Sequence, residues 1–106
     1  MASPELQNVL PLQGEIDLHV SPGIAASLAT MVSAHPARLV VDLSGVTYID
    51  SSGLAVLIQA MQNVEEYGGK LTLAGVNENV RSIFEMARLD QFFLIFPHVD
   101  AAMAAT

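Results

Sequence analysis

Residues 38–64, RLVVDLSGVTYIDSSGLAVLIQAMQNV, carry the patterns that decide the fold. The first part, Arg38 to Leu43, is short, apolar and rich in β-branched residues, which is typical of a strand buried on both faces. Residues 44–50 are expected to form a loop. After Gly53 the apolar residues fall at helical spacing and form one stripe, which consists of Leu54, Leu57, Ile58, Met61 and Val64. The stretch therefore predicts a buried strand, a loop and an amphipathic helix.

The alternation of strand and helix continues on the N-terminal side. A strand is expected over Val9 to Ile16, at a sheet edge or with a bulge, because Pro11 cannot donate to a ladder. A helix should follow, with the Ser21 hydroxyl as its cap and proline at its first position, and it should end at His35-Pro36. Its apolar positions are Ile24, Leu28, Met31 and Val32.

The same order continues on the C-terminal side. After a stop at Gly68-Gly69, a strand is expected over Lys70 to Ala74, and then a helix capped by Asn77. Gln91 to Phe96 should form a last strand, followed by a short helix capped by Asp100. The residues expected in the core from this half are Val80, Ile83, Phe84, Met86, Ala87, Phe92, Phe93 and Phe96. The order predicts an α/β fold in one domain, 1–106, with a mainly parallel sheet of about four strands.

Composition excludes several classes of function. The chain has 106 residues and a formal net charge of −7, from eleven acids and four bases, so nucleic acid and anionic membranes are poor partners. No apolar run approaches the roughly 20 residues of a membrane span, and the N-terminus does not resemble a secretory signal, so we expect a cytoplasmic protein. There is no cysteine, and His19, His35 and His98 lack metal-ligand spacing. We expect no metal, no cofactor and no catalytic constellation.

The segment Asp50-Ser51-Ser52-Gly53 is the main candidate for function. It should lie at the carboxyl end of a parallel strand, on the rim where such sheets bind their partners. Ser and Asp before a helix are ordinary capping residues. A hydroxyl at a helix N-terminus also lies in positive potential beside unpaired N–H groups, where a phosphate can be stabilised. The residues alone leave both interpretations open.

Several segments together resemble one family. Residues 40–54, VVDLSGVTYIDSSGL, are similar to the segment shared by bacterial anti-sigma-factor antagonists of the STAS family. Gly14-Glu15-Ile16-Asp17 resembles the family's Gly-Glu-Leu-Asp segment, and residues 68–71 and 80–84 resemble later segments. The resemblance covers roughly residues 9–96 in the expected order.

The resemblance implies a STAS-type fold and a switchable binding protein that is not an enzyme. Unphosphorylated family members bind an anti-sigma factor, a serine/threonine kinase of the GHKL type, and so release a sigma factor. The kinase phosphorylates the first hydroxyl residue after the Asp, which corresponds to Ser51, with Ser52 as second candidate. A PP2C-type phosphatase reverses this step. Asp17, Asp50, Ser52 and Gly53 match positions near the partner-binding surface.

The chain departs from the family pattern in two places. Family members usually begin with a hairpin before the Gly-Glu-Leu-Asp segment, whereas here about eight residues precede Val9, so the first family strand is expected to be shortened or missing. The sheet edge that this exposes would favour a homodimer. After Asp17 the chain has Leu-His-Val-Ser-Pro where the family often has Thr-Ala. The alternative function is a constitutive STAS scaffold subunit in a stress-sensing or lipid-transport ATPase complex, with Ser51 only capping the helix.

Overall fold

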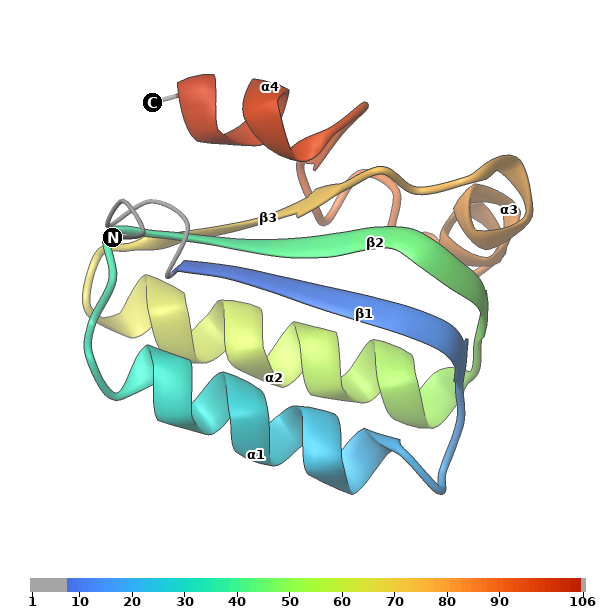
Figure 1. Ribbon diagram of the computed structural model, residues 1–106, viewed down its shortest axis with the longest axis horizontal. Coiled ribbons are helices and arrows are strands. Elements are labelled where there is room, and N and C mark those ends of the chain that lie inside the picture. Colours follow the sequence, from blue (N-terminus) through green and yellow to red (C-terminus); the bar gives the residue numbers. More distant parts are fainter. Residues whose placement is uncertain (1–7, 106) are drawn as a thin grey trace.

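The computed structural model describes residues 8–105 as a parallel four-stranded sheet with helices around it (Figure 1). The strands are β1 (Val9–Ile16), β2 (Arg38–Ile49), β3 (Lys70–Ala74) and β4 (Ile95–Phe96), and they lie side by side in sequence order. The helices are α1 (Ser21–Val32), α2 (Ser51–Glu66), α3 (Glu78–Met86) and α4 (Val99–Ala104). The predicted α/β class, the parallel sheet and the order of elements are confirmed.

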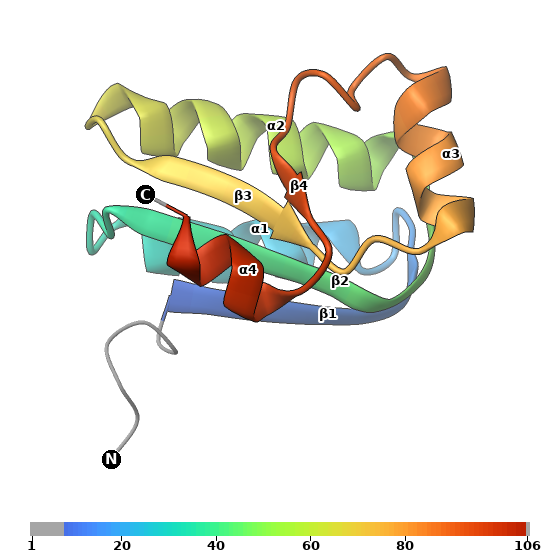
Figure 2. The ribbon, with the colours of Figure 1, turned by 90° about the horizontal axis from the view of Figure 1, so that it is seen from above.

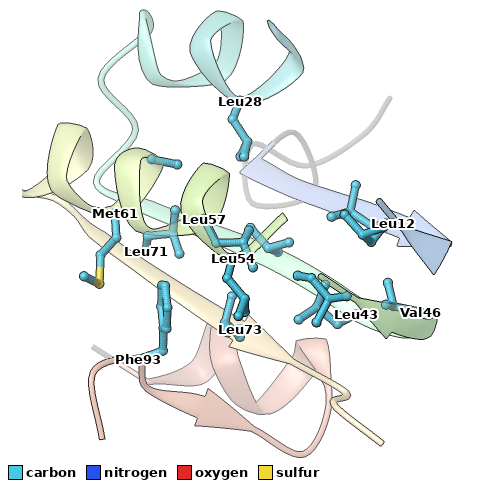
Figure 3. Close-up of a cluster of buried hydrophobic side chains, with 14 of the residues drawn as sticks. Leu12, Leu28, Leu43, Val46, Leu54, Leu57, Met61, Leu71, Leu73 and Phe93 are labelled. Atoms are coloured by element: carbon cyan, nitrogen blue, oxygen red, sulfur yellow. The ribbon is translucent and has the colours of Figure 1, made fainter. Parts of the chain in front are cut away.

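The sheet has a helical layer on each face. Helices α1 and α2 cover one face and α4 lies across the other, while α3 lies beyond the carboxyl ends of β2 and β3 (Figures 1 and 2). Most of the core lies under α2, where Leu54 and Leu57 face Leu73 and other side chains of the sheet (Figure 3). On the opposite face Val40 packs with Ala102 of α4, so the first half of β2 is buried on both faces, as predicted.

Strand β2 is longer than predicted, and the expected loop over residues 44–50 is wrong. The first half of β2 pairs with β3, from Arg38 to Asp42. Its second half continues to Ile49 because β1 pairs with it, with Gln13 opposite Gly45 and Ile16 opposite Ile49. The Ser44-Gly45 pair, which suggested a break, lies inside this strand. The extension carries the end of β2 directly to the start of α2.

Strand β1 behaves as its proline predicts. It lies at one edge of the sheet formed by residues 8–105, and its register shifts between Pro11 and Gln13. A second shift follows Gly14, whose φ of 77° suits a glycine. The prediction about a shortened or missing hairpin before Val9 concerns residues 1–7 and lies outside the described residues.

Most of the other differences between the predicted and the observed elements lie in the C-terminal third of the chain. Residues 91–94 form turns, and only Ile95–Phe96 pair with β3, so the predicted strand from Gln91 is too long. Phe93 is buried, but Phe92 is exposed. Ala87 and Met86 are exposed as well, because α3 ends at Met86 and Arg88, with φ 61°, turns the chain away.

Of the caps predicted for the last two helices, one is confirmed and the other is wrong. The cap predicted for α3 is confirmed, since the Asn77 side chain accepts a hydrogen bond from the backbone N–H of Val80. The cap predicted for α4 is wrong, because Asp100 lies inside the helix and the His98 ring nitrogen Nδ1 accepts from the Ala101 N–H at 3.1 Å. The other end of α4 is held by Arg38, whose guanidinium donates to the Met103 and Ala105 carbonyls. None of the helices in the described part of the chain has the length and apolar character of a membrane span.

Candidate functional site

The rim at the start of α1 and α2 brings together the residues singled out in the sequence. Strands β1 and β2 end side by side, with Ile16 opposite Ile49, and the Asp50 N–H donates to the Ile16 carbonyl at 3.0 Å. Asp17 and Asp50, which follow these two residues, therefore lie at the same end of the sheet. Helices α1 and α2 both begin there (Figure 1).

Asp50 is the N-cap of α2. One carboxylate oxygen, Oδ1, accepts from the backbone N–H groups of Ser52 at 2.9 Å and Gly53 at 3.1 Å. The same oxygen accepts from the Ser52 hydroxyl at 2.5 Å. These hydrogen bonds, that of the Ser52 hydroxyl first, lower the pKa of Asp50 below its ordinary value, against the opposing effect of burial. The cap is therefore a carboxylate and not one of the serine hydroxyls.

Ser51 and Ser52 differ in surroundings although they are adjacent. Ser51 is the first residue of α2 and its side chain is exposed. Within residues 8–105 its hydroxyl has no hydrogen-bond partner, so it is the more accessible of the two. Ser52 is half-buried, and its hydroxyl lies between Asp50 and the Ser21 hydroxyl, which is 2.7 Å away.

The sequence predicted that Ser21 caps α1, and this prediction is wrong. The helix has no side-chain cap, and Ser21 is its first residue, only 4% exposed. The Ser21 hydroxyl points back and lies 2.7 Å from the Asp17 carbonyl oxygen. Asp17 itself uses its carboxylate to accept from the His19 N–H at 3.0 Å, which shapes the loop between β1 and α1. No periodicity signals the contact between Ser21 and Ser52, because it joins residues from two helices.

Gly53 is buried, and its lack of a side chain allows α2 to begin close to the sheet. A Cβ atom at this position would lie 2.7 Å from side-chain carbons of both Ile16 and Ile49. Gly53 therefore fixes the position of the Ser51-bearing turn through packing, and any part it has in partner binding would be indirect.

A shallow groove of about 370 Å³ runs from Ser51 to α3. Its lining is mainly apolar and includes Tyr48, Leu54, Ile83 and Met86. Tyr48 is 45% exposed and Met86 is 86% exposed. Tyr48 was not among the candidates from the sequence, and Met86 was expected in the core, although the helical period of about 100° per residue places it well away from buried Phe84. The exposed apolar surface next to Ser51 is suited to protein binding.

Possible metal ligands in the chain are its histidines and its acidic side chains. Within the described part of the chain, no group of three or more His, Asp and Glu side chains is placed to hold a metal ion. His19 lies in the loop before α1, His35 stacks on Tyr67 at a ring-centroid distance of 4.5 Å, and His98 caps α4. The three histidines are thus separated in the structure as well as in the sequence.

Comparisons with known proteins agree with this geometry. The STAS domain family model matches residues 2–102. BtrV of Bordetella bronchiseptica, named as an anti-sigma factor antagonist, is 32% identical over 94 residues, covering 89% of this chain and 78% of BtrV. The anti-sigma-B factor antagonist of Bacillus subtilis is 31% identical over 78 residues, covering 74% of this chain and 71% of that protein. The crystal structure of an anti-sigma factor antagonist from Mycobacterium paratuberculosis has a TM-score of 0.83 at 28% identity, covering 92% of this chain and 82% of that one. The chain therefore belongs to the STAS domain family, and within that family it is similar to the anti-sigma factor antagonists.

Proposed function

We propose that the chain is a cytoplasmic anti-sigma-factor antagonist that is switched by phosphorylation of Ser51. In its unphosphorylated form it binds an anti-sigma factor that is a serine/threonine kinase of the GHKL type, and a sigma factor is released. The kinase transfers the terminal phosphoryl group of ATP. The bond from Ser51 Oγ to phosphorus forms, the bond from phosphorus to the bridging oxygen of ADP breaks, and the hydroxyl proton passes to a base of the kinase. A PP2C-type phosphatase hydrolyses the ester, and the chain itself catalyses no step.

The observation that carries this proposal is the exposure of Ser51 at the N-terminus of α2, on the lining of an apolar groove. An exposed hydroxyl is open to a kinase, whereas the neighbouring Ser52 hydroxyl is held by two partners. Phosphorylation adds about −1.5 to −2 charge. That charge would lie beside ionised Asp50 and at the mouth of an apolar surface, so a partner that fills the groove would lose contact.

The surface available to the partner extends over both sides of Ser51. On one side lie Tyr48 and Met86 of the groove. On the other, the loop before α1 exposes Leu18, at 72%, and Val20. We infer that Asp17 shapes this loop and that Asp50 positions Ser51, so both acids support partner binding through the local fold.

The test is affinity capture of the tagged chain from its own cells, followed by addition of ATP and magnesium. We expect a GHKL-type kinase among the bound proteins, phosphate at Ser51 by mass spectrometry, and release of the kinase. Ser51→Ala should bind but resist release, and Ser51→Asp should bind weakly. Ser27→Ala, at an exposed position of α1, is the matched control and should behave as the wild type.

Two results would contradict the proposal. Phosphate found only outside Ser51 and Ser52 would exclude the assigned site. Capture of a transporter or an ATPase complex, with no kinase and no ATP-dependent release, would favour the constitutive scaffold.

A further inference from the structure

The contacts around Ser52 contain more hydrogen-bond distances than available protons. Ser21 Oγ is 2.7 Å from the Asp17 carbonyl oxygen and 2.7 Å from Ser52 Oγ, which is 2.5 Å from Asp50 Oδ1. The two outer atoms are a carbonyl and a carboxylate oxygen, and both only accept. The two hydroxyls supply one proton each, so three contacts share two protons.

The charged acceptor decides how these protons are placed. Hydrogen bonds to a carboxylate are stronger than those to a neutral oxygen, so the Ser52 proton points to Asp50. Ser52 Oγ can then only accept, and the donor available to it is Ser21. When the Ser21 proton turns to Ser52, both hydroxyls form one chain that ends on the Asp50 carboxylate.

We propose that Ser21 is a positioning residue that directs phosphorylation to Ser51 by holding the Ser52 hydroxyl inside the rim. This inference rests on the proposed function. A hydroxyl that accepts a phosphoryl group must turn a lone pair toward ATP, and the contact with Ser21 occupies one of the two lone pairs of Ser52. To act as acceptor, Ser52 must leave both Asp50 and Ser21, whereas the exposed Ser51 hydroxyl has no partner to leave among residues 8–105.

The first arm of the test needs no kinase. The unfolding equilibrium constant is measured by urea titration for the wild type, Ser21→Ala, Ser52→Ala and the double variant. A hydrogen bond between the two hydroxyls should appear as a coupling of about fivefold between the two substitutions. Ser27→Ala in place of Ser21→Ala should show no coupling with Ser52→Ala. A coupling factor of one for the Ser21 pair would overturn the inference.

The second arm follows phosphate incorporation in chains that lack Ser51. Ser51→Ala and Ser51→Ala/Ser21→Ala are incubated with the captured kinase, ATP and magnesium, and the site is mapped by mass spectrometry. Removal of one hydrogen bond should raise the rate at Ser52 about fivefold. Ser21→Thr, which keeps the hydroxyl, should restore the low rate, and Ser27→Ala should leave it unchanged.

The two proposals fail in distinguishable ways. If wild-type Ser51 is phosphorylated but Ser52 reacts equally fast with and without Ser21, the inference about Ser21 is wrong and the proposed function stands. If no kinase phosphorylates Ser51 or Ser52 in any variant, the proposed function fails and takes this inference with it, even where the first arm shows coupling.

Discussion

The starts of α1 and α2 occupy equivalent places but are built differently. Each helix follows one of two paired strands, begins with Ser at its first position and has Gly at its third. At α2 the Asp50 carboxylate closes the helix end, with the extended backbone of a regular N-cap, φ −99° and ψ −176°. At α1 the N-cap residue is Val20, with a helical backbone, φ −102° and ψ −19°, and no capping side chain.

The start of α2 exposes its first serine, whereas the start of α1 buries its own. A capped and tightly packed α2 holds Ser51 in one exposed position, because the hydrogen bonds of the turn go to Asp50 instead of the Ser51 hydroxyl. The start of α1 turns its serine inward to Ser52 and leaves apolar Leu18 and Val20 outside. One helix start thus carries the proposed modification, and the other supports it and offers contact surface.

The two glycines at the third positions should show the largest contrast. Gly53→Ala places a Cβ against Ile16 and Ile49 at 2.7 Å, and we expect a loss of about 1–3 kcal/mol of unfolding free energy from overpacking. Gly23→Ala meets no atom of residues 8–105 within 4 Å, and alanine restricts the unfolded chain, so we expect a gain of about 0.4–1 kcal/mol. Urea denaturation of both variants measures the difference. Equal effects would show that the close approach of α2 to the strand ends is not a property of the folded protein.

The two aspartates of the rim should show the next largest contrast. Asp50→Ala removes an acceptor of three hydrogen bonds at the end of α2, and we expect a loss of about 1–2 kcal/mol of unfolding free energy. Asp17→Ala removes one hydrogen bond in an exposed loop, and the expected loss is below about 0.5 kcal/mol. Denaturation midpoints at neutral pH would measure both. A larger loss for Asp17 would mean that the β1–α1 loop, and not the cap, stabilises the rim.

The two serines should differ in their effect on Asp50. The Ser52 hydroxyl is the main cause of the lowered pKa of Asp50, so Ser52→Ala should raise that pKa toward its ordinary value, whereas Ser51→Ala should leave it in place. Because the pKa of Asp50 is lower in the folded chain than in the unfolded chain, the unfolded chain binds more protons than the folded chain as the pH falls. The associated stability is complete above the unfolded pKa and is lost as the pH falls through the folded pKa. Carboxyl ¹³C NMR titration measures the shift, and an unchanged pKa in Ser52→Ala would contradict the assignment.

The comparison also shows which features the sequence could predict. The bounds of β3, the Asn77 cap and the edge position of β1 follow from Gly, Asn and Pro at turns and from local periodicity, and all are confirmed. The position of Ser51 at the start of an amphipathic helix was also predictable, because the apolar stripe begins immediately after Gly53.

The remaining features depend on contacts between distant segments. Strand β2 extends through Ser44-Gly45 because β1 lies beside it, and no local rule anticipates that pairing. Serine often caps helices, but the Ser21 hydroxyl instead contacts the hydroxyl of Ser52, which is 31 positions away. A local signal such as a Ser-Pro pair predicts which side chain could cap a helix. The hydrogen bond that this side chain makes depends on the neighbouring helix.

The smallest expected effect comes from giving α1 the cap that it lacks. Asn is among the best N-cap residues, and a new cap is ordinarily worth about 1 kcal/mol. At Val20, however, the backbone is helical instead of extended, so an Asn side chain would not reach the N–H groups of the first turn in the usual way. The Ser21 N–H already donates to the Asp17 carbonyl at 2.9 Å, and Pro22 has no N–H to cap. We therefore expect Val20→Asn to change the unfolding free energy by less than about 0.5 kcal/mol, as an ordinary exposed substitution does. Asn77→Ala removes the regular cap of α3, with φ −77° and ψ 172°, and also the hydrogen bond that the Asn77 side chain donates to the Val46 carbonyl at 2.7 Å. It should lose at least about 1 kcal/mol in the same urea titration. A gain at Val20 as large as the loss at Asn77 would mean that α1 begins with unsatisfied N–H donors. Both helix starts could then be capped in the same way, and α1 would only lack the capping side chain.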